Sequence, residues 1–362
     1  MKLKEQNVLF FTRNMGLGGT ENVVLQMCET LKPLVNKIVV CSSGGVHTEY
    51  LKEMGIKHYN IPDISEKSIY NTLTILKTVH KIIKLENITI VHTHHRMAAF
   101  YTYMLNIFIN FKFLASVHGE FYDKRLFTKI AYSKAHIIAC GEMVKKNLTD
   151  YFGIKKKILV LRNAVAKDVS PLVEISSLTK YRKDNYKLVG YIGRLSEEKG
   201  VLYLVDSLPY YAENEKVLYV IVGEGPLKED MDRKLEANGC KNKVLYLGYR
   251  NDPQNIIRQL DCVVLPSLTE GLPLAPIESF AQGKPVVASA VGGTVEIVKD
   301  GKNGILISPK MSSKIAEAIK KMLFDEKFYE SCSKNARNDY DSKFSMNVFN
   351  SKLQKIYSDI TG

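Results

Sequence analysis

Short apolar runs alternate with amphipathic stretches along nearly the whole chain of 362 residues. In the first half, five runs are typical of buried strands: NVLFFT, KIVVCS, ITIVHT, FKFLASVHG and AHIIACG. Between them, ENVVLQMCETLK and TLTILKTVHKIIK place apolar residues at helical spacing. In the second helix one stripe would face a sheet, formed by Ile75, Leu76, Val79, Ile82 and Ile83. The alternation predicts an α/β domain built on a parallel sheet.

The pattern lapses over residues 166–185, which are polar, contain a proline and show no sustained period. It then resumes with YKLVGYIG, KVLYVIVGEG, KVLYLG, DCVVLP, KPVVAS and GILIS. Because the chain is also too long for one ordinary core, we predict two doubly wound parallel-sheet domains. Our boundaries are a first domain over 1–168, a linker over 169–186, a second domain over 187–342 and a terminal helix over 343–362.

The overall composition excludes several classes of protein. Apolar residues make up 45% of the chain and charged residues 25%, which are values of a soluble globular protein. The start MKLKEQNVLFF is too short and polar for a signal peptide, and the longest apolar stretch, residues 97–111, falls short of a bilayer span. Six scattered cysteines without a C-x-x-C pair indicate reduced, packed thiols. We therefore expect a cytoplasmic protein.

The charge balance is less ordinary. The formal net charge is +13, and residues 112–157 carry ten basic residues against four acidic ones. Two interpretations stay open: a solvated basic face, or a patch that binds an anionic membrane surface or an acidic substrate.

A glycine-rich turn, TRNMGLGGTEN, lies between the first strand and the first helix. Gly16, Gly18 and Gly19 precede Thr20, a possible N-cap, so the backbone could approach a phosphate at the helix start. The dinucleotide fingerprint is absent because Glu21 stands where it requires glycine, which disfavours a nicotinamide enzyme. A phosphate or sugar loop and plain turn glycines both remain possible.

Two cations follow the first strand of the second domain in GRLSEEKG. The rigid fork of Arg194 and the point charge of Lys199 suit a diphosphate whose leaving charge must be neutralised. Taken alone, the same segment could be a solvated basic loop.

Four histidines follow strands of the first domain: His92, His94, His95 and His118. Neither the helical H-x-x-x-H spacing nor a cysteine cluster accompanies them, so we predict no metal site. His118 ends a strand and precedes Gly119, which places it well to touch a substrate. As a neutral imidazole it can donate or accept a hydrogen bond.

The stretch TEGLPLAPIES carries two carboxylates around an expected helix start. With Pro276 at the first helical position, Glu278 would lie in the first turn, where it could merely complement the helix dipole, and Glu270 could be a plain loop acid. The flanking residues 271–273 favour a different interpretation. Free backbone N–H groups at a helix entry bind phosphate, and a carboxylate one turn on can accept from ribose hydroxyls.

Together these motifs carry a resemblance that runs through nearly the whole chain. The E-x7-E spacing of Glu270 and Glu278, followed by GKPVVASAVGGTVEIV and preceded by GRLSEEKG and GLGGTEN, resembles the retaining nucleotide-sugar glycosyltransferases of family 4. That family has the GT-B fold, and the likeness is to its bacterial surface-polysaccharide members. The resemblance implies two Rossmann-like domains facing each other across a cleft. The first would serve the acceptor, the second would bind the nucleotide sugar, and the terminal helix would return to the first.

The resemblance also implies residue roles. Arg194 and Lys199 would hold the diphosphate, Glu278 the ribose hydroxyls and Glu270 the transferred sugar. The whole implied donor set is Gly18, Gly19, Arg194, Lys199, Tyr249, Arg250, Glu270, Gly271, Leu272 and Glu278, in which Tyr249 or Arg250 contacts the base. The implied catalytic group is His118, Arg194, Lys199 and Glu270, and the acceptor side comprises Glu21, His94 and His95.

The expected reaction moves a sugar from a nucleotide diphosphate sugar, with UDP favoured, to a hydroxyl of a lipid-linked or cell-surface glycan with retention. The resemblance implies neither a metal nor a cofactor, and no nucleic-acid partner. Peripheral contact with the cell membrane would fit such an acceptor. Two other functions remain open: a nucleotide-sugar 2-epimerase of the same fold, and a non-catalytic protein that binds glycans or polyanions.

Overall fold

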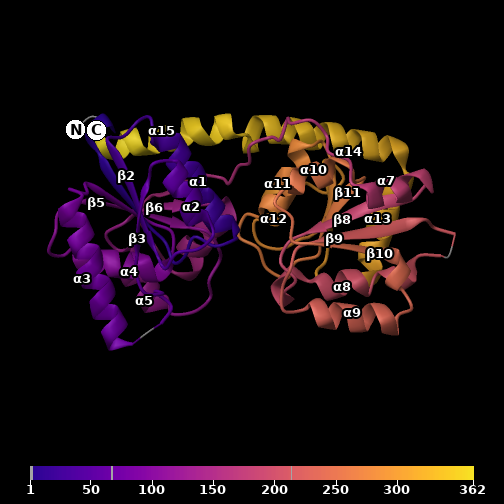
Figure 1. The fold of residues 1–362 in the computed structure, drawn as a ribbon, viewed down its shortest axis with the longest axis horizontal. Coiled ribbons are helices and arrows are strands. Elements are labelled where there is room, and N and C mark those ends of the chain that lie inside the picture. Colours follow the sequence, from indigo (N-terminus) through magenta and orange to yellow (C-terminus); the bar gives the residue numbers. More distant parts are fainter. Residues whose placement is uncertain (1–2, 67, 213) are drawn as a thin grey trace. The chain divides into compact units, whose positions relative to one another are not determined.

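The computed structural model describes residues 3–66, 68–212 and 214–362. It divides into two compact units (Figure 1). The first unit is Met1–Asn163 together with Asn347–Gly362, and the second is Ala164–Met346. Each unit is built on one parallel sheet.

The first unit holds a seven-stranded sheet in the order β3-β2-β1-β4-β5-β6-β7. Its strands are β1 Asn7–Phe11, β2 Lys37–Ser42, β3 Lys57–Asn60, β4 Ile90–Thr93, β5 Lys112–Val117, β6 His136–Ala139 and β7 Ile158–Val160. Its helices before residue 163 are α1 Gly19–Leu31, α2 His47–Glu53, α3 Ile69–Leu85, α4 Arg96–Leu105, α5 Arg125–Tyr132 and α6 Glu142–Lys146, which continues into a π-helical turn, Asn147–Tyr151. In Figure 1, α1 lies over one face of this sheet, and α3, α4 and α5 lie over the other.

The second unit holds a six-stranded sheet in the order β10-β9-β8-β11-β12-β13. Its strands are β8 Lys187–Ile192, β9 Val217–Val222, β10 Val244–Gly248, β11 Cys262–Leu265, β12 Val286–Ser289 and β13 Gly304–Ile307. Its helices include α7 Ser176–Lys183, α8 Val201–Val205, α9 Lys228–Ala237, α10 Pro253–Arg258, α11 Leu274–Ala281, α12 Thr294–Ile297, α13 Ser312–Phe324 and α14 Glu326–Asp339. Side chains of α8, α9 and α13 share one buried core on the sheet.

Most strands were predicted because they are buried on both faces. β1, β9 and β11 are buried along their whole length, as expected for central strands of a sheet covered on both sides. All six strands of the second unit coincide with predicted runs. Two strands of the first unit were missed. β3 lies at an edge and is half-exposed, and β7 is an edge strand of only three residues, so neither produces a sustained apolar run.

The predicted linker over 169–186 is wrong, because this segment folds within the second unit. It contains the helix α7, in which Leu178 is buried. Side chains of α10 and the turn after it bind its backbone: Asn255 accepts from the Val173 N–H at 3.0 Å, and Gln259 accepts from the Ile175 N–H at 3.0 Å. The first unit accordingly ends at Asn163 and not at residue 168. These contacts are long-range in sequence, so local pattern could not reveal them.

The end of the chain forms one further helix, α15 Met346–Thr361, whose residues from Asn347 onward group with the first unit. Thr30 of α1 donates to the Asn350 side chain at 2.7 Å. Phe349, Leu353 and Tyr357 of this helix are buried, while Val348 is only half-buried.

Two expectations from composition can be compared with the structure. All six cysteines are buried and free, which confirms packed thiols in place of disulfides. Within residues 3–66, 68–212 and 214–362, no helix combines the length and apolarity needed to cross a bilayer.

Candidate functional site

Each sheet has one point where its strand order reverses direction. In doubly wound folds, ligands bind outside the carboxyl ends of the strands that flank this switch point. The order of the first sheet puts its switch point between β1 and β4, and that of the second sheet between β8 and β11. Most of the predicted site residues follow these strands or their neighbours, and Tyr249 and Arg250 follow β10 at the edge of the second sheet.

At the switch point of the second unit, Lys199 and Glu270 form an ion pair. The Lys199 ammonium donates to both oxygens of the Glu270 carboxylate at 2.8 and 2.9 Å. Ser267 donates to the same carboxylate at 2.7 Å, and Glu270 is only 8% exposed. The sequence analysis singled out both residues but did not foresee that they pair. In this structure, the positive charge predicted for a diphosphate is balanced by the acid predicted for a sugar.

Close backbone contacts hold the loops around this pair together. Gly200 ends the loop after β8 with φ of +68°, and a Cβ there would lie 2.0 Å from the Pro266 carbonyl oxygen. Gly293 follows β12, and a Cβ there would lie 1.8 Å from the Gly271 carbonyl oxygen. Only glycine permits such approaches. The loops after β8, β11 and β12 are thereby packed against one another, which positions Lys199 and Glu270.

Arg194 differs from Lys199 although both belong to the same loop. Its side chain is exposed, and among the described residues its guanidinium has no hydrogen-bond or ion-pair partner. Its backbone is anchored, since the Tyr191 hydroxyl donates to the Arg194 carbonyl at 2.7 Å. A fixed backbone with a free guanidinium leaves Arg194 available for an anion.

Helix α11 begins earlier than predicted. It starts at Leu274, with Pro273 as N-cap, so Pro276 is the third helical residue and not the first. Proline is tolerated throughout a first turn because the N–H groups there have no intrahelical partner. Glu278 therefore lies beyond the first turn, and the helix-dipole interpretation loses its basis.

The Glu278 carboxylate is partly buried and has no hydrogen-bond or ion-pair partner among the described residues. Burial raises its pKa to about 7. An unpaired carboxylate of this kind costs stability when it is charged. A buried carboxylate without a partner is typical of a binding site in which the ligand supplies the hydrogen-bond donor.

The loop after β10 distinguishes the two residues predicted for the base. Arg250 is engaged in a two-fold ion pair with Asp252, with both nitrogen–oxygen distances 2.9 Å. Tyr249 is 48% exposed and offers a free aromatic face. The geometry therefore favours Tyr249 over Arg250 as a stacking partner.

In the first unit, the glycine-rich turn leads directly into α1. The helix starts at Gly19 with Gly18 as N-cap, and no side chain caps it, so the expected cap at Thr20 is wrong. The Glu21 carboxylate folds back over Gly18, within 2.3 Å of where a Cβ would stand. Burial raises the pKa of Glu21, while Arg13 opposes the shift. A backbone hydrogen bond at Glu21 also opposes the shift, so the start of α1 is covered by a partly buried acid.

His94 and His118 lie next to each other, following the neighbouring strands β4 and β5. The distance from His94 Nδ1 to His118 Nε2 is 2.9 Å, and the rings stack with centroids 5.1 Å apart. The outer nitrogens, His94 Nε2 and His118 Nδ1, are buried and have no partner among the described residues. Burial lowers the pKa of His118 to about 4, and that of His94 well below its usual range. Both rings are therefore neutral at pH 7.

The other two histidines of this group have structural partners. His92 Nδ1 lies 2.7 Å from the Tyr357 hydroxyl, and its Nε2 lies 2.8 Å from the Ser116 hydroxyl. His95 caps α4, because its Nδ1 accepts from the Met97 N–H at 3.1 Å. His92 thus joins α15 to the sheet, while His95 orients the start of α4.

Two groups in the first unit were missed by the sequence analysis. His47 Nε2 and Glu120 Oε1 are buried without partners among the described residues. His47 begins α2 beside the glycine-rich turn, where its N–H donates to the Met15 carbonyl at 2.9 Å. Glu120 follows His118 by two residues. A lone histidine and a loop acid carry no spacing signal, so only the structure shows them.

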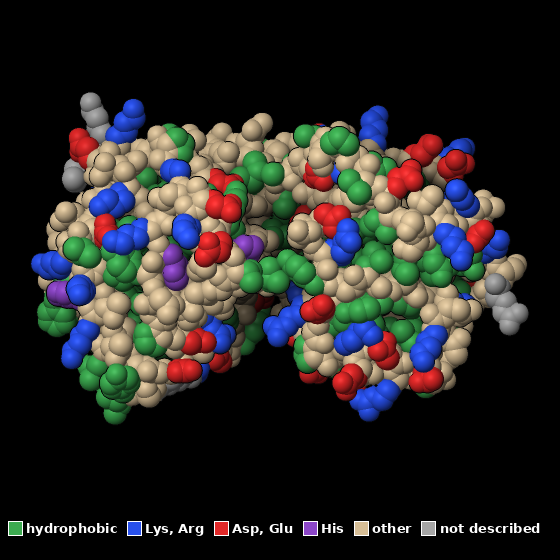
Figure 2. All heavy atoms as spheres, viewed as in Figure 1, with side chains coloured by type: hydrophobic (Ala, Val, Ile, Leu, Met, Phe, Trp, Pro, Cys, Tyr) green, Lys and Arg blue, Asp and Glu red, His purple; other side chains and the backbone are tan. Residues whose placement is uncertain are grey.

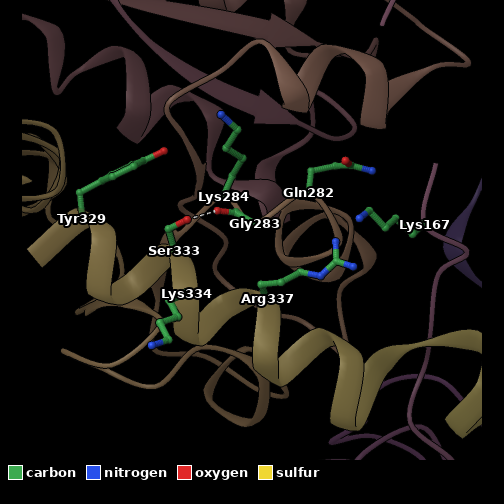
Figure 3. A pocket seen from close by; sticks show the side chains of 8 residues that line it. All are labelled: Lys167, Gln282, Gly283, Lys284, Tyr329, Ser333, Lys334 and Arg337. Carbon is green, nitrogen blue, oxygen red and sulfur yellow. Dashed lines mark hydrogen bonds between the residues drawn. The ribbon is translucent and has the colours of Figure 1, made fainter. Parts of the chain in front are cut away.

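A hollow of about 410 Å³ in the second unit contains none of the predicted residues (Figure 3). It lies beside the turn between α11 and β12, at the amino end of β12, whereas ligands at a switch point bind at the carboxyl ends of strands. Arg337 is already bound to the Ala281 carbonyl at 2.7 Å and to Asp341 at 3.0 Å. Figure 3 shows Lys334 pointing away from Lys167. Because its cations do not converge, this hollow is not assigned a ligand.

Two models of known protein families match this chain. The family model described as Glycosyltransferase Family 4 matches residues 17–169, and the model described as Glycosyl transferases group 1 matches residues 176–339. The chain belongs to the family 4 glycosyltransferases. The first match begins within the glycine-rich turn and covers both histidines of the stacked pair, and the second covers the ion pair and Glu278.

Relatives and solved structures agree with this assignment. The glycosyltransferase is 28% identical over 367 residues to the UDP-Gal:alpha-D-GlcNAc-diphosphoundecaprenol alpha-1,3-galactosyltransferase of Escherichia coli, covering 95% of this chain and 94% of that relative. A glycosyltransferase from Rickettsia africae has the same fold, with a TM-score of 0.85, 22% identity and 98% and 99% of the two chains covered. Anabaena HepE in complex with UDP-glucose has a TM-score of 0.84, 19% identity and coverage of 98% and 100%. The predicted GT-B fold is thereby confirmed.

Proposed function

We propose that this glycosyltransferase moves a sugar from a nucleotide diphosphate sugar, with UDP favoured, to a hydroxyl of a lipid-linked or cell-surface glycan, with retention at the anomeric carbon. The observation that carries the proposal is the Lys199–Glu270 pair at the switch point of the second unit, with the free guanidinium of Arg194 on the same loop. The E. coli relative, named for a UDP-galactose donor and a lipid-linked acceptor, and the UDP-glucose complex of HepE support the donor and acceptor classes.

The ion pair suggests how donor binding prepares the site. When the diphosphate arrives, Lys199 turns from Glu270 to the phosphate oxygens, where Arg194 adds a second positive charge. The Glu270 carboxylate is then released to accept hydrogen bonds from sugar hydroxyls. Before the ligand binds, Lys199 and Glu270 neutralise each other. After it binds, each pairs with a group of the ligand, so neither charge is left without a partner.

The transfer itself needs charge stabilisation more than proton transfer by a side chain. The bond from the anomeric carbon to the diphosphate oxygen breaks, and a bond from that carbon to the acceptor oxygen forms on the same face. The acceptor proton passes to the departing phosphate oxygen. Arg194 and Lys199 stabilise the negative charge that grows on the diphosphate, so no metal is required.

The remaining residues hold the donor and orient the sugar. Glu278 accepts from the ribose hydroxyls, which supplies the donors that its buried carboxylate lacks. Tyr249 stacks on the base. In the first unit, His118 contacts the transferred sugar, and the amides of Gly18 and Gly19 approach the diphosphate. Glu21 and His95 remain assigned to the acceptor side, whereas His94 is only 4% exposed and faces His118, so it is not placed to touch an acceptor.

A thermal-shift screen of nucleotide sugars tests the proposal most simply. A bound donor stabilises the folded state in proportion to the logarithm of its concentration over Kd. We expect a UDP-sugar to raise Tm, and transfer to an acceptor glycolipid to persist in EDTA. A changed sugar nucleotide formed without acceptor would instead show a 2-epimerase, and the absence of any stabilising nucleotide sugar would indicate a non-catalytic glycan-binding protein.

For the acceptor, we propose that the first unit docks on an anionic membrane through the face formed by α5 and the turn after α4. Leu126 of α5 is 72% exposed and Phe108 is 86% exposed. Three exposed basic residues lie close to Leu126 in the chain, namely Lys124, Arg125 and Lys129, of which Lys124 pairs with Asp123. On the face drawn in Figure 2, by contrast, basic and acidic side chains are interspersed. Exposed apolar side chains among cations are typical of interfacial binding.

The structure changes which residues should test this docking. Lys156, part of the basic run 155–157, donates to the carbonyls of Ser133 at 2.6 Å and Ala135 at 2.9 Å, so its replacement would disturb the fold. Leu126→Glu is the better variant, with Leu73→Glu on the exposed side of α3 as the matched control. We expect only Leu126→Glu to reduce binding to vesicles that contain phosphatidylglycerol. Equal binding by wild type and Leu126→Glu would remove the proposal.

A further inference from the structure

We infer that His94 is a positioning residue that holds His118 as the Nδ1–H tautomer, so that His118 presents a hydrogen-bond donor at its outer nitrogen. The inference rests on the 2.9 Å contact between His94 Nδ1 and His118 Nε2 and on the two outer nitrogens that have no partner among the described residues. It deepens the proposed function, since it assigns a chemical role to the histidine predicted to touch the sugar.

The shared hydrogen bond couples the two tautomers. Both rings are neutral at pH 7, so each carries one N–H, and the contact between them uses one proton. If His94 Nδ1–H donates, His118 Nε2 accepts and the His118 proton must sit on Nδ1. If His118 Nε2–H donates, the His94 proton must sit on Nε2. The two outer nitrogens are therefore one donor and one acceptor, and the two rings always share the same tautomer.

Burial decides between the two states. A buried N–H without an acceptor is rarer in proteins than a buried acceptor without a donor. Both outer nitrogens are buried in the free protein. His94 is only 4% exposed and lies in the core, whereas His118 lies at the end of β5 and is half-buried, so only the His118 Nδ1–H lies near the surface, where a bound ligand can supply an acceptor. The state with both protons on Nδ1 is therefore favoured.

The surroundings keep the His94 ring in this position. Its backbone N–H donates to the Phe11 carbonyl at 2.9 Å, which ties it to β1 across the switch point. Its ring packs against His92, with centroids 4.5 Å apart, and against Phe10 at 5.5 Å. His92 is held in turn by hydroxyls at both nitrogens, Tyr357 and Ser116. Because the His94 ring is held in place, its hydrogen bond to His118 Nε2 sets the tautomer of His118.

This assignment restricts what His118 can do in transfer. A protonated Nδ1 donates to an oxygen of the bound sugar but cannot take a proton from the acceptor hydroxyl. His118 then acts by orienting the sugar, which agrees with the proton passing to the leaving phosphate. The proton of the reaction does not travel through the histidine pair.

Long-range 1H–15N NMR of protein labelled with 15N-histidine tests the tautomers directly, with no substrate present. At pH 7, we expect wild-type His94 and His118 both to show a protonated Nδ1 and a bare Nε2. His58, whose Nε2 bonds Ser42 at 2.8 Å, serves as an internal reference. A His118 signal with the proton on Nε2 would overturn the inference.

Two variants separate positioning from packing. His94→Phe keeps an aromatic ring at this position but removes the donor, so nothing then holds His118 in the Nδ1–H form and its two tautomers should become mixed. His94→Asn keeps an N–H near the position of Nδ1 and should restore the Nδ1–H form. An unchanged His118 tautomer in a folded His94→Phe protein would also overturn the inference. If His94→Phe fails to fold, the wild-type spectrum alone still decides.

Activity gives the second readout. We expect His94→Phe to lower kcat about tenfold with little change in the Kd of the donor, as for loss of one hydrogen bond in the transition state, and His94→Asn to recover most of it. The proposed function and this inference can fail separately. If no nucleotide sugar supports transfer, the NMR result still stands; if transfer occurs but His118 does not respond to His94, only the inference is wrong.

Discussion

The two switch points of this glycosyltransferase carry side chains of different kinds: a charged pair in the second unit and a neutral pair in the first. At the second unit, charged groups are paired: Lys199 and Glu270 neutralise each other at 2.8 Å, and Ser267 adds a third contact. At the first unit, the central groups are neutral imidazoles whose outer nitrogens have no partner among the described residues. Both arrangements follow strands that flank a reversal of strand order.

This difference indicates which part of a nucleotide sugar, the diphosphate or the sugar, the side chains of each unit could bind. A diphosphate brings a large negative charge, and a pair of opposite charges can open to receive it without leaving either group bare. A sugar is neutral and offers hydroxyls, which neutral donors and acceptors recognise without a charge penalty. The charged side is therefore suited to the leaving group and the neutral side to the transferred sugar.

Breaking the charged side should have the largest effect. Lys199→Ala leaves the nearly buried Glu270 carboxylate unpaired, so we expect transfer to fall at least about 100-fold and stability to fall by about 2 kcal/mol. Kinetics and thermal unfolding measure both. The matched control is Lys234→Ala, which breaks the more exposed pair with Asp206 and should cost about 0.5 kcal/mol with no effect on transfer. Equal effects of the two variants would contradict the assignment.

Removing the neutral side should affect turnover but not donor binding. For His118→Ala, we expect kcat to fall about 100-fold because a donor to the sugar is lost in the transition state. The Kd for the nucleotide sugar, measured by calorimetry, should stay within about twofold, because the side chains assigned to the diphosphate, ribose and base all belong to the second unit. A large loss of donor affinity would show that the division between the units is wrong.

The Glu278 carboxylate should favour binding of the nucleotide sugar but lower the stability of the ligand-free protein. Burial raises its pKa from near 4.5 to about 7, so between these values the folded state binds more protons than the unfolded state. Stability therefore falls as pH rises from 4.5 to 7, by up to ~3 kcal/mol, and stays lower above pH 7. Glu278→Gln should unfold at higher temperature than wild type at pH 8 but at the same temperature near pH 4.

The same substitution should weaken nucleotide-sugar binding about tenfold at pH 8, because an amide accepts from two ribose hydroxyls less well than a carboxylate. In wild type, affinity should rise from pH 6 to pH 8 as Glu278 loses its proton. Calorimetry at the two pH values measures this. A variant that is less stable at pH 8 yet binds normally would return Glu278 to a purely structural role.

The smallest effects should separate the two residues of the loop after β10. Tyr249→Ala removes an exposed ring and should weaken donor binding about threefold, whereas Arg250→Ala removes a side chain that already pairs with Asp252 and should leave Kd unchanged. The reverse order of effects would show that Arg250, and not Tyr249, contacts the base.

Much of the fold was predictable because burial on both faces leaves a strong signal. All strands of the second sheet and five of the first were found from apolar runs, while β3 and β7 were missed because edge strands are short or half-exposed. The segment 169–186 was misread as a linker. Its helix is held by Asn255 and Gln259, which lie far away in the sequence.

The candidate site was predictable as a set of residues but not as a set of contacts. Motif order singled out Lys199 and Glu270, yet their ion pair depends on β8 and β11 being neighbours, which follows from topology. The histidine pair depends likewise on β4 lying beside β5. The start of α11 was misplaced because proline fits any position of a first turn. The local sequence pattern identifies which residues could act in the site, but their contacts depend on which strands are neighbours in the fold.

The most direct test of the central claim is the affinity for a UDP-sugar, measured by calorimetry in wild type and in the Arg194→Ala, Lys199→Ala double variant. If the switch point of the second unit holds the donor diphosphate, wild type binds and the double variant binds at least about 100-fold more weakly while remaining folded. Equal affinities in two folded proteins would contradict the account.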